Sequence, residues 1–256
     1  MFFAQKDKGG PYSKTIEELY QRADVLVVKM AKYVDSETVL IVLSDHGFAS
    51  FERGCDLNAW LRDQGYLVLK PGCSGEKGYL REIDWSRTRA YTFGLAGIYV
   101  NQKGRESQGI VTKEQAASLT KELAAKLTGL RDDERDRVAV RKAWSSDSLY
   151  TGPYLSAAPD VIVGFADGYR ASWDAAVGKV TAHVFSDNTK AWSGDHCIDP
   201  HLVPGVIFAN RKILAENPGI EDLAPTALEL FGVAPPPYME GKPLFVESRK
   251  LREAAA

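Results

Sequence analysis

An apolar run, Val39-Leu40-Ile41-Val42-Leu43, ends almost directly on Asp45 and His46. Continuous Val/Ile/Leu runs are typical of parallel strands buried on both faces, and ligands of open α/β sheets bind beyond the carboxyl ends of such strands. Carboxylate and imidazole groups both bind zinc and manganese, so the run predicts a buried parallel strand that presents part of a metal site. The competing interpretation is a turn in which Asp45 caps backbone amides and His46 is simply exposed.

A second histidine segment, Gly194-Asp195-His196-Cys197, lies far downstream. It precedes another apolar run at residues 203–209, so the fold can return His196 to the same sheet edge as the first pair. Residues 220–233 then predict a short helix, because acidic residues stand in its first turn and Gly232 follows its end. His196 is therefore a third candidate metal ligand.

Three blocks in this order carry a resemblance to a known family. They are Ser-Asp-His-Gly-Phe after the apolar run (residues 39–48), the Gly-x-His segment (192–209), and an Asp-x-Ala-Pro-Thr helix followed by Met-x-Gly-Lys-Pro-Leu (220–244). Together they resemble the alkaline phosphatase superfamily, and its type I phosphodiesterase/nucleotide pyrophosphatase branch in particular. The resemblance implies an α/β fold with a mainly parallel sheet sandwiched by helices, and hydrolysis of phosphate esters.

The resemblance also implies the roles of the candidate ligands. Members of the superfamily hold two divalent metal ions a few ångströms apart. Their Asp-His pair binds the metal that also holds a Ser/Thr nucleophile, and the Gly-x-His histidine binds the second metal. By resemblance, Asp45 and His46 bind one metal and His196 the other. Zinc suits mixed carboxylate and imidazole ligands, and manganese tolerates them. Two metals can stabilise the attacking and leaving oxygens of an in-line displacement at phosphorus.

Residues 1–44 depart from the family pattern. The family has an Asp that ends the first strand, a Ser/Thr nucleophile at a helix start, and an Asp-x-x-x-His pair before the Asp-His motif. The aspartates here are Asp7, Asp24 and Asp35, and none has a histidine four residues later. Residues 15–34 instead predict an amphipathic helix. No Ser/Thr nucleophile is identifiable, so we expect an N-terminally incomplete domain that supplies part of the two-metal site, and the activity of this chain by itself stays open.

The remaining pattern predicts one alkaline phosphatase-like α/β domain over residues 1–256, with a smaller α+β lobe at residues 66–190. Asp56 is typical of the N-cap of a short helix that ends before Gly65. Thr112 and Gln115 predict a capping box for a helix that continues to residue 127. Short strands are expected at residues 66–69, 91–93, 98–100, 138–140 and 161–163.

Two further residues are candidate substrate contacts. His201 lies five residues beyond His196 and is expected near the metals. Arg105 can bind phosphate oxygens bidentately, although an exposed loop explains it as well. Cys197 is interpreted as a packing residue, because adjacent side chains on an extended backbone point apart and do not pair as nucleophile and base.

Composition limits the partners. A formal net charge of -2 over 256 residues gives no electrostatic basis for binding nucleic acid or an anionic membrane. Three cysteines without metal-ligand spacing, and the lack of a span-length apolar stretch, favour the cytoplasm unless a signal precedes residue 1. The expected partner is a small phosphate ester or nucleotide, and the oligomeric state stays open.

The sequence thus predicts a metal-dependent phosphoric ester hydrolase of phosphodiesterase or nucleotide pyrophosphatase type. Two alternatives remain. The chain can be a catalytically inactive half-domain that binds a metal, or a partner through an uncovered sheet edge. It can also be a sulfatase-like or cofactor-independent phosphoglycerate mutase-like member of the same superfamily.

Overall fold

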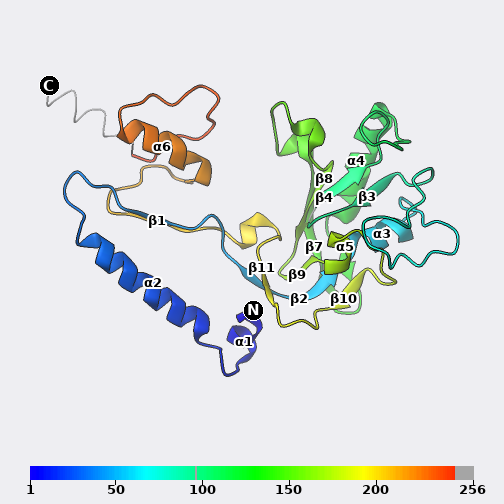
Figure 1. Cartoon of the computed structure of the whole chain (residues 1–256), viewed down its shortest axis with the longest axis horizontal. Coiled ribbons are helices and arrows are strands. Elements are labelled where there is room, and N and C mark those ends of the chain that lie inside the picture. The colour runs from blue at the N-terminus through cyan, green and yellow to red at the C-terminus, as the bar shows by residue number, and fades with distance from the viewer. Residues whose placement is uncertain (96, 246–256) are drawn as a thin grey trace. The chain divides into compact units, whose positions relative to one another are not determined.

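The computed structural model describes residues 1–95 and 97–245, which form two compact units. Unit 1 comprises residues 1–17 and 48–204, and unit 2 comprises residues 18–47 with the segment from residue 205 onward. Figure 1 labels their elements. The expected lobe at residues 66–190 falls within unit 1. A single domain over residues 1–256 stays a prediction.

Unit 1 contains most of the secondary structure. Its elements are α1 (Phe3–Lys8), β2 (Ala49–Cys55), α3 (Leu57–Asp63), β3 (Ala90–Thr92), β4 (Gly97–Val100), α4 (Lys113–Leu127), β5 (Arg131–Asp132), β6 (Arg137–Val138), β7 (Val140–Ser145), β8 (Val161–Phe165), β9 (Gly168–Ala171), α5 (Trp173–Ala176), β10 (Phe185–Asp187), β11 (Gly194–Asp195) and short 3₁₀ turns η1 (Ser146–Ser148), η2 (Leu155–Ala157) and η3 (Pro200–Leu202).

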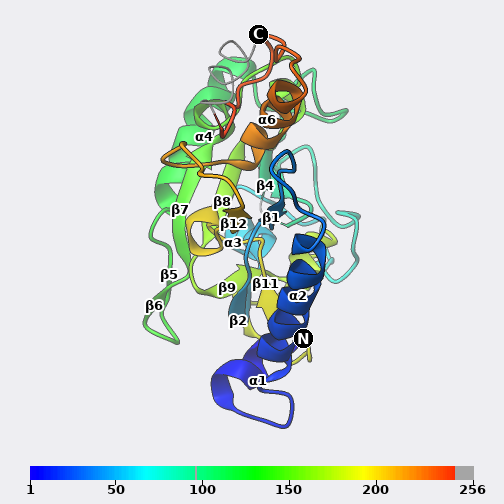
Figure 2. The same cartoon turned by 90° about the vertical axis from the view of Figure 1, so that its left-hand side faces the viewer.

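One part of the core of unit 1 lies between helix α4 and the four-stranded sheet β3-β4-β8-β7, and the core continues to α3 and β9. Figures 1 and 2 show α4 lying along this sheet. Leu119, Leu123 and Leu127 recur every four residues on one face of α4 and are all buried. The predicted capping box is confirmed, because Thr112 Oγ1 accepts from Gln115 N and the Gln115 side chain accepts from Thr112 N.

A second sheet is built around strand β2, which pairs with each of its other strands, and this sheet positions His196. Strand β2 pairs antiparallel with β10 and β11 and parallel with β9. The predicted N-cap at Asp56 follows β2 directly and is confirmed, because its carboxylate accepts from Ala59 N at 2.9 Å. Since β11 ends at Asp195, the next residue, His196, leaves the sheet at its edge.

The prediction of a mainly parallel sheet is wrong for the described residues. Among their named strand pairs only β2 and β9 run parallel, and the others are antiparallel. The connections explain this result: a parallel pair needs a crossover of about a dozen residues or more, whereas antiparallel neighbours can be joined by a short turn. Only residues 93–96 separate β3 from β4. The structure is therefore a mixed α/β fold with several sheets.

Unit 2 contains most of α2 (Thr15–Ala31) together with β1 (Ile41–Leu43), β12 (Ile207–Ala209), η4 (Ile220–Asp222) and α6 (Leu223–Leu230). The predicted helices at residues 15–34 and 220–233 are confirmed in type. Helix α6 ends before Gly232, whose φ of 73° is the left-handed conformation that favours glycine after a helix.

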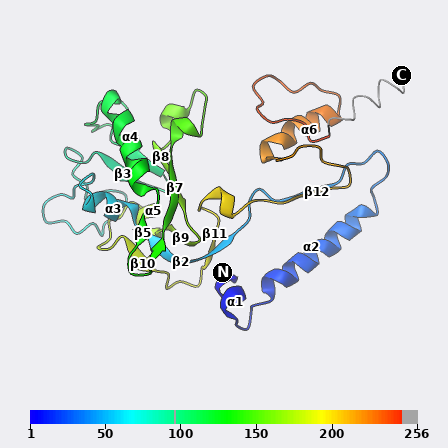
Figure 3. The same ribbon diagram turned by 180° about the vertical axis from the view of Figure 1, so that it is seen from behind.

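Strand β1 differs from its prediction in direction and burial. It pairs antiparallel with β12, with Leu43 opposite Ile207, and the described residues give it no second neighbour (Figure 3). A two-stranded ribbon covers neither of its own faces, so Leu43 is 42% exposed and Phe208 64% exposed. The apolar run of the sequence is therefore a strand, but not one buried on both faces.

Candidate metal centre

Asp45 and His46 follow β1 on unit 2 and contact each other. Asp45 Oδ1 accepts a hydrogen bond from His46 N at 3.0 Å, and His46 Nδ1 lies 2.9 Å from the carbonyl oxygen of Gly47. In the neutral ring, donation from Nδ1 to this carbonyl assigns the lone pair to Nε2. His46 Nε2 lies 3.4 Å from Asp45 Oδ2. Two metal-binding atoms of adjacent residues therefore stand side by side.

This separation fits one edge of a metal coordination tetrahedron. Two ligand atoms that are each about 2.1 Å from a zinc ion are about 3.4 Å apart at the tetrahedral angle. The observed 3.4 Å between Nε2 and Oδ2 matches that edge. The Asp45 side chain is 71% exposed, so a cation can reach the pair from solution. The turn interpretation also holds locally, because Asp45 does cap the amide of His46.

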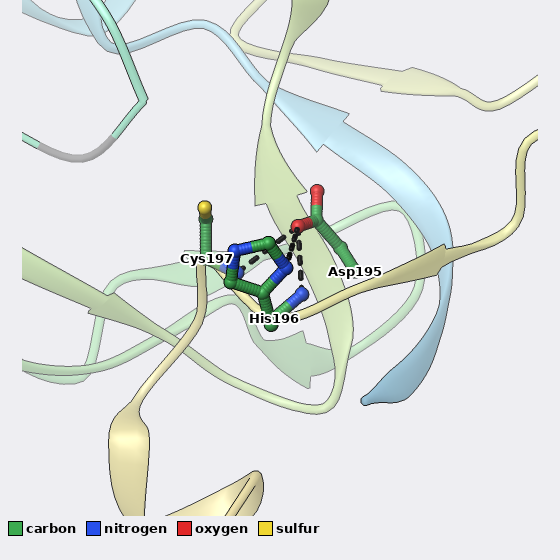
Figure 4. A group of neighbouring side chains, drawn as sticks. All are labelled: Asp195, His196 and Cys197. Atoms are coloured by element: carbon green, nitrogen blue, oxygen red, sulfur yellow. Dashed lines mark hydrogen bonds and ion pairs between the residues drawn. The ribbon is translucent and has the colours of Figure 1, made fainter. Parts of the chain in front are cut away.

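Asp195, His196 and Cys197 form a second group, on unit 1 (Figure 4). Their ligand atoms lie within 4.8 Å of one another. Asp195 Oδ1 accepts from His196 N at 2.7 Å and from Cys197 N at 3.0 Å, and it lies 3.8 Å from His196 Nδ1. The group repeats the Asp-His dipeptide of unit 2 with the same hydrogen bond from histidine amide to aspartate carboxylate.

Arg170 holds the carboxylate of Asp195 inside unit 1. The Arg170 Nε lies 2.8 Å from Asp195 Oδ2, and the two side chains are 2% and 8% exposed. The Arg170 guanidinium also lies 3.8 Å from the ring centroid of Trp173. Burial lowers the pKa of Arg170, and the charge of Asp195 opposes that shift. Because both oxygens of Asp195 have protein partners, this side chain is arranged to support the His196 turn.

Cys197 is a thiol in this setting. Burial raises its pKa first, and the Asp195 carboxylate raises it further. A thiol with a raised pKa is a poor nucleophile and gives up its proton reluctantly to a metal. Its half-buried position agrees with the packing role predicted from the sequence.

The structure divides the predicted metal ligands between the units. Asp45 and His46 are together on unit 2, and His196 is on unit 1. The shared two-metal site of these three residues stays a prediction. The sequence reasoning did not single out Asp195 or Arg170. The repeated Asp-His dipeptide could have drawn attention to Asp195, whereas no local signal marks Arg170, which the pairing of β9 with β2 brings into place.

Arg105 takes part in internal ion pairs. Its Nη1 and Nη2 donate to the two carboxylate oxygens of Asp160 at 3.0 and 2.6 Å, and its Nε donates to Glu106 at 2.8 Å. Nη2 also donates to the Val100 carbonyl. The bidentate geometry expected for phosphate is therefore occupied by a carboxylate, and the predicted substrate contact of Arg105 stays a prediction.

His201 lies in η3 of unit 1, and its ring contacts a buried carboxylate. Its Nδ1 is 2.8 Å from Asp199 Oδ1, and the His201 side chain is 73% exposed. The exposed ring remains available to a substrate, so the predicted contact stays a prediction.

A pocket of about 720 Å³ opens on unit 1 and reaches the neighbourhood of His196 through Phe48. The Phe48 ring, which lines this pocket, meets the His196 ring edge-on with centroids 5.2 Å apart. Cations outnumber carboxylates in the lining, although several of them form ion pairs there. The charged lining residues are Lys6, Lys8, Arg53, Arg135, Arg137 and Lys190 against Asp7, Glu52, Asp167 and Asp187.

These features define a mixed α/β protein that carries two Asp-His pairs. Carboxylate and imidazole side chains are the groups that bind divalent cations in many proteins. Comparison with protein families identifies it further. The chain belongs to the type I phosphodiesterase/nucleotide pyrophosphatase family, whose model matches residues 4–192. This is a family of phosphoric ester hydrolases that generally use divalent metals. The match includes Asp45 and His46 and ends before His196.

A search of curated proteins finds no match to this chain. Across residues 1–95 and 97–245, no helix combines the length and apolar character needed to cross a membrane.

Proposed function

We propose that this chain is a metal-dependent phosphodiesterase of nucleotide pyrophosphatase type. It binds divalent cations, zinc foremost, through Asp45 and His46 on unit 2 and through His196 on unit 1. Its substrate is a small phosphate ester or nucleotide. The observation that carries the proposal is the 3.4 Å separation of His46 Nε2 from Asp45 Oδ2, which suits two ligands of one cation.

The surroundings of both histidines support this assignment. The Gly47 carbonyl holds His46 Nδ1, and a hydrogen bond on one ring nitrogen is how proteins orient the other nitrogen toward a metal. On unit 1, the Arg170–Asp195 pair fixes the turn that carries His196. Bound divalent cations supply charge stabilisation for phosphoryl oxygens in this class of reaction.

Zinc binding tests the proposal most directly. The full chain is loaded with zinc, dialysed, and its zinc content measured for the wild type and for Asp45→Asn, His46→Gln and His196→Gln. Because removing even a supporting residue weakens metal binding about 10-fold to 100-fold, removing a ligand is expected to weaken it by at least that much. His183→Gln is the matched control, since His183 is an exposed histidine of unit 1 outside both groups.

Hydrolysis of bis(4-nitrophenyl) phosphate is measured on the same proteins. We expect the wild type to hydrolyse this diester. Hydrolysis should stop when a chelator removes the metal and should recover when zinc is returned. The proposal is refuted if the wild type holds no more zinc than His46→Gln and His196→Gln, or if these variants keep full zinc-dependent activity.

A second candidate function, partner binding, is favoured by helix α2. None of its residues is buried. Leu19, Leu26 and Met30, which share one face at i, i+7 and i+11, are 54%, 61% and 56% exposed. An apolar helix face of this kind is typical of an interaction site. Sedimentation velocity separates the two candidates: a self-associating chain that retains no zinc would support partner binding alone, and a zinc-binding monomer would count against it.

A further inference from the structure

Asp199, His201 and Arg141 form a polar cluster on unit 1 that the proposed metal ligands do not use. Asp199 is 2% exposed. Its Oδ1 accepts from His201 N at 3.0 Å and lies 2.8 Å from His201 Nδ1. Its Oδ2 accepts from Arg141 Nη1 at 3.2 Å. The side chains of His201 and Arg141 are 73% and 51% exposed, so one buried carboxylate holds two exposed groups.

This arrangement fixes which nitrogen of His201 can exchange a proton with a ligand. A carboxylate at Nδ1 keeps the proton on that nitrogen and orients the ring, so Nε2 is the nitrogen left to exchange a proton with a ligand. Although burial by itself raises the pKa of Asp199, the hydrogen bonds from His201 and the charge of Arg141 lower it overall. The carboxylate therefore stays ionised at neutral pH, and it holds the Nδ1 side of a ring whose side chain is 73% exposed.

The backbone makes this placement rigid. Asp199 is the N-cap of η3 and Pro200 fixes φ at its first position. His201 follows His196 by five residues, so their Cα atoms are at most about 18 Å apart. Arg141 is half-exposed, so its guanidinium can contact an anionic ligand beside His201 in addition to Asp199.

We propose that His201 is the proton donor to the leaving-group oxygen in phosphodiester hydrolysis, and that Asp199 is its positioning residue. This inference rests on the proposed function. As the bond from phosphorus to the leaving oxygen breaks, its electron pair stays on that oxygen, which takes the proton from His201 Nε2. The net reaction consumes one water: its oxygen ends on phosphorus, one of its protons stays with the phosphate product, and the other restores the ring.

This role selects the substrate class. An alcohol leaving group, such as the hydroxyl of a nucleoside, needs a proton as it departs. A nitrophenolate is stable as an anion and departs without one. His201 is therefore the residue that extends hydrolysis to diesters of ordinary alcohols.

The test compares two diesters on the zinc-loaded full chain: a dithymidine dinucleotide and bis(4-nitrophenyl) phosphate. Because positioned general acids contribute about 10²-fold to 10⁴-fold, His201→Gln is expected to lower kcat/KM for the dinucleotide by about 100-fold or more. The nitrophenyl diester is expected to change little. Asp199→Asn follows the same pattern more weakly, and His183→Gln changes neither substrate. The exposed position of His201 makes the glutamine variant safe for folding.

A second measurement does not depend on activity. Nitrogen-15 NMR of the imidazole ring is expected to show His201 protonated at Nδ1 in the wild type and to lose that preference in Asp199→Asn. Mixed tautomers in the wild type would overturn the dyad.

The outcomes separate this inference from the proposed function. Equal loss on both diesters, or no loss on either, overturns the role of His201 while leaving the hydrolase intact. A zinc-loaded wild type that cleaves neither diester refutes the proposed function, and the role of His201 with it.

Discussion

Replacing Asp195 by alanine leaves a buried cation without its partner. Arg170, only 2% exposed, would lose the carboxylate that lies 2.8 Å from its Nε. The backbone amides of His196 and Cys197 would lose their common acceptor. Since removing one member of a buried ion pair costs about 3–5 kcal/mol, the free energy of unfolding of unit 1 should fall by that amount.

The variant Asp195→Asn separates the effect of the carboxylate charge from the effect of the backbone hydrogen bonds. It keeps an oxygen that can accept the two backbone hydrogen bonds, but it removes the charge that Arg170 faces. Because hydrogen bonds to charged groups contribute about 1.5–3 kcal/mol, this variant should lose about 2 kcal/mol and lie between the wild type and the alanine variant.

Tryptophan fluorescence in urea measures these losses for unit 1 specifically. All five tryptophans belong to that unit: Trp60, Trp85, Trp144, Trp173 and Trp192. The control is Asp63→Ala, which breaks an exposed pair with Arg62 (2.7 Å; side chains 48% and 25% exposed) and should cost about 0–1 kcal/mol. If Asp195→Ala lies within about 1 kcal/mol of this control, the buried Arg170–Asp195 pair does not stabilise unit 1 by the expected amount.

Three further predictions follow from local geometry. Thr112→Ala removes the N-cap of α4 and should lower the free energy of unfolding by about 1 kcal/mol in urea melts, whereas Thr112→Ser should not; equal losses would contradict the capping box. Gly75→Ala places a Cβ 2.2 Å from the Val180 carbonyl oxygen at a φ of 89°, so it should cost about 2 kcal/mol or more, and a neutral result would refute that contact. The pKa of Asp199 is lowered in the folded state, so its stabilisation is present above the unfolded pKa of about 3.9 and is lost as the pH falls through the folded value. In Asp199→Asn, the urea midpoint should therefore fall less steeply as the pH is lowered than in the wild type. An unchanged pH profile would contradict the stabilisation by the Asp199 carboxylate.

The helix ends of this protein were predictable because their signals act within a few residues. Asp56 accepts from the amide three residues on, Thr112 and Gln115 cap each other, and Gly232 supplies the positive φ after α6. The Asp45–His46 pair was predictable for the same reason, because adjacent side chains and one carbonyl set its geometry.

Other features depend on residues that are distant in the sequence. The bidentate pair of Arg105 with Asp160 is one of them, because the fold brings together two residues that are 55 positions apart. The sequence of β1 predicted a strand, but its direction and burial depend on β12, which lies more than 160 residues further along the chain.

The sequence by itself determined the local elements, the Asp45–His46 pair and the family, because short-range hydrogen bonding and residue order specify them. The tertiary structure alone decided that the sheets are mainly antiparallel, that Arg170 neutralises Asp195, and that Arg105 is paired internally. The physical reason is that strand direction and the burial of charge depend on which distant segments pack together, and the local sequence does not record those partners.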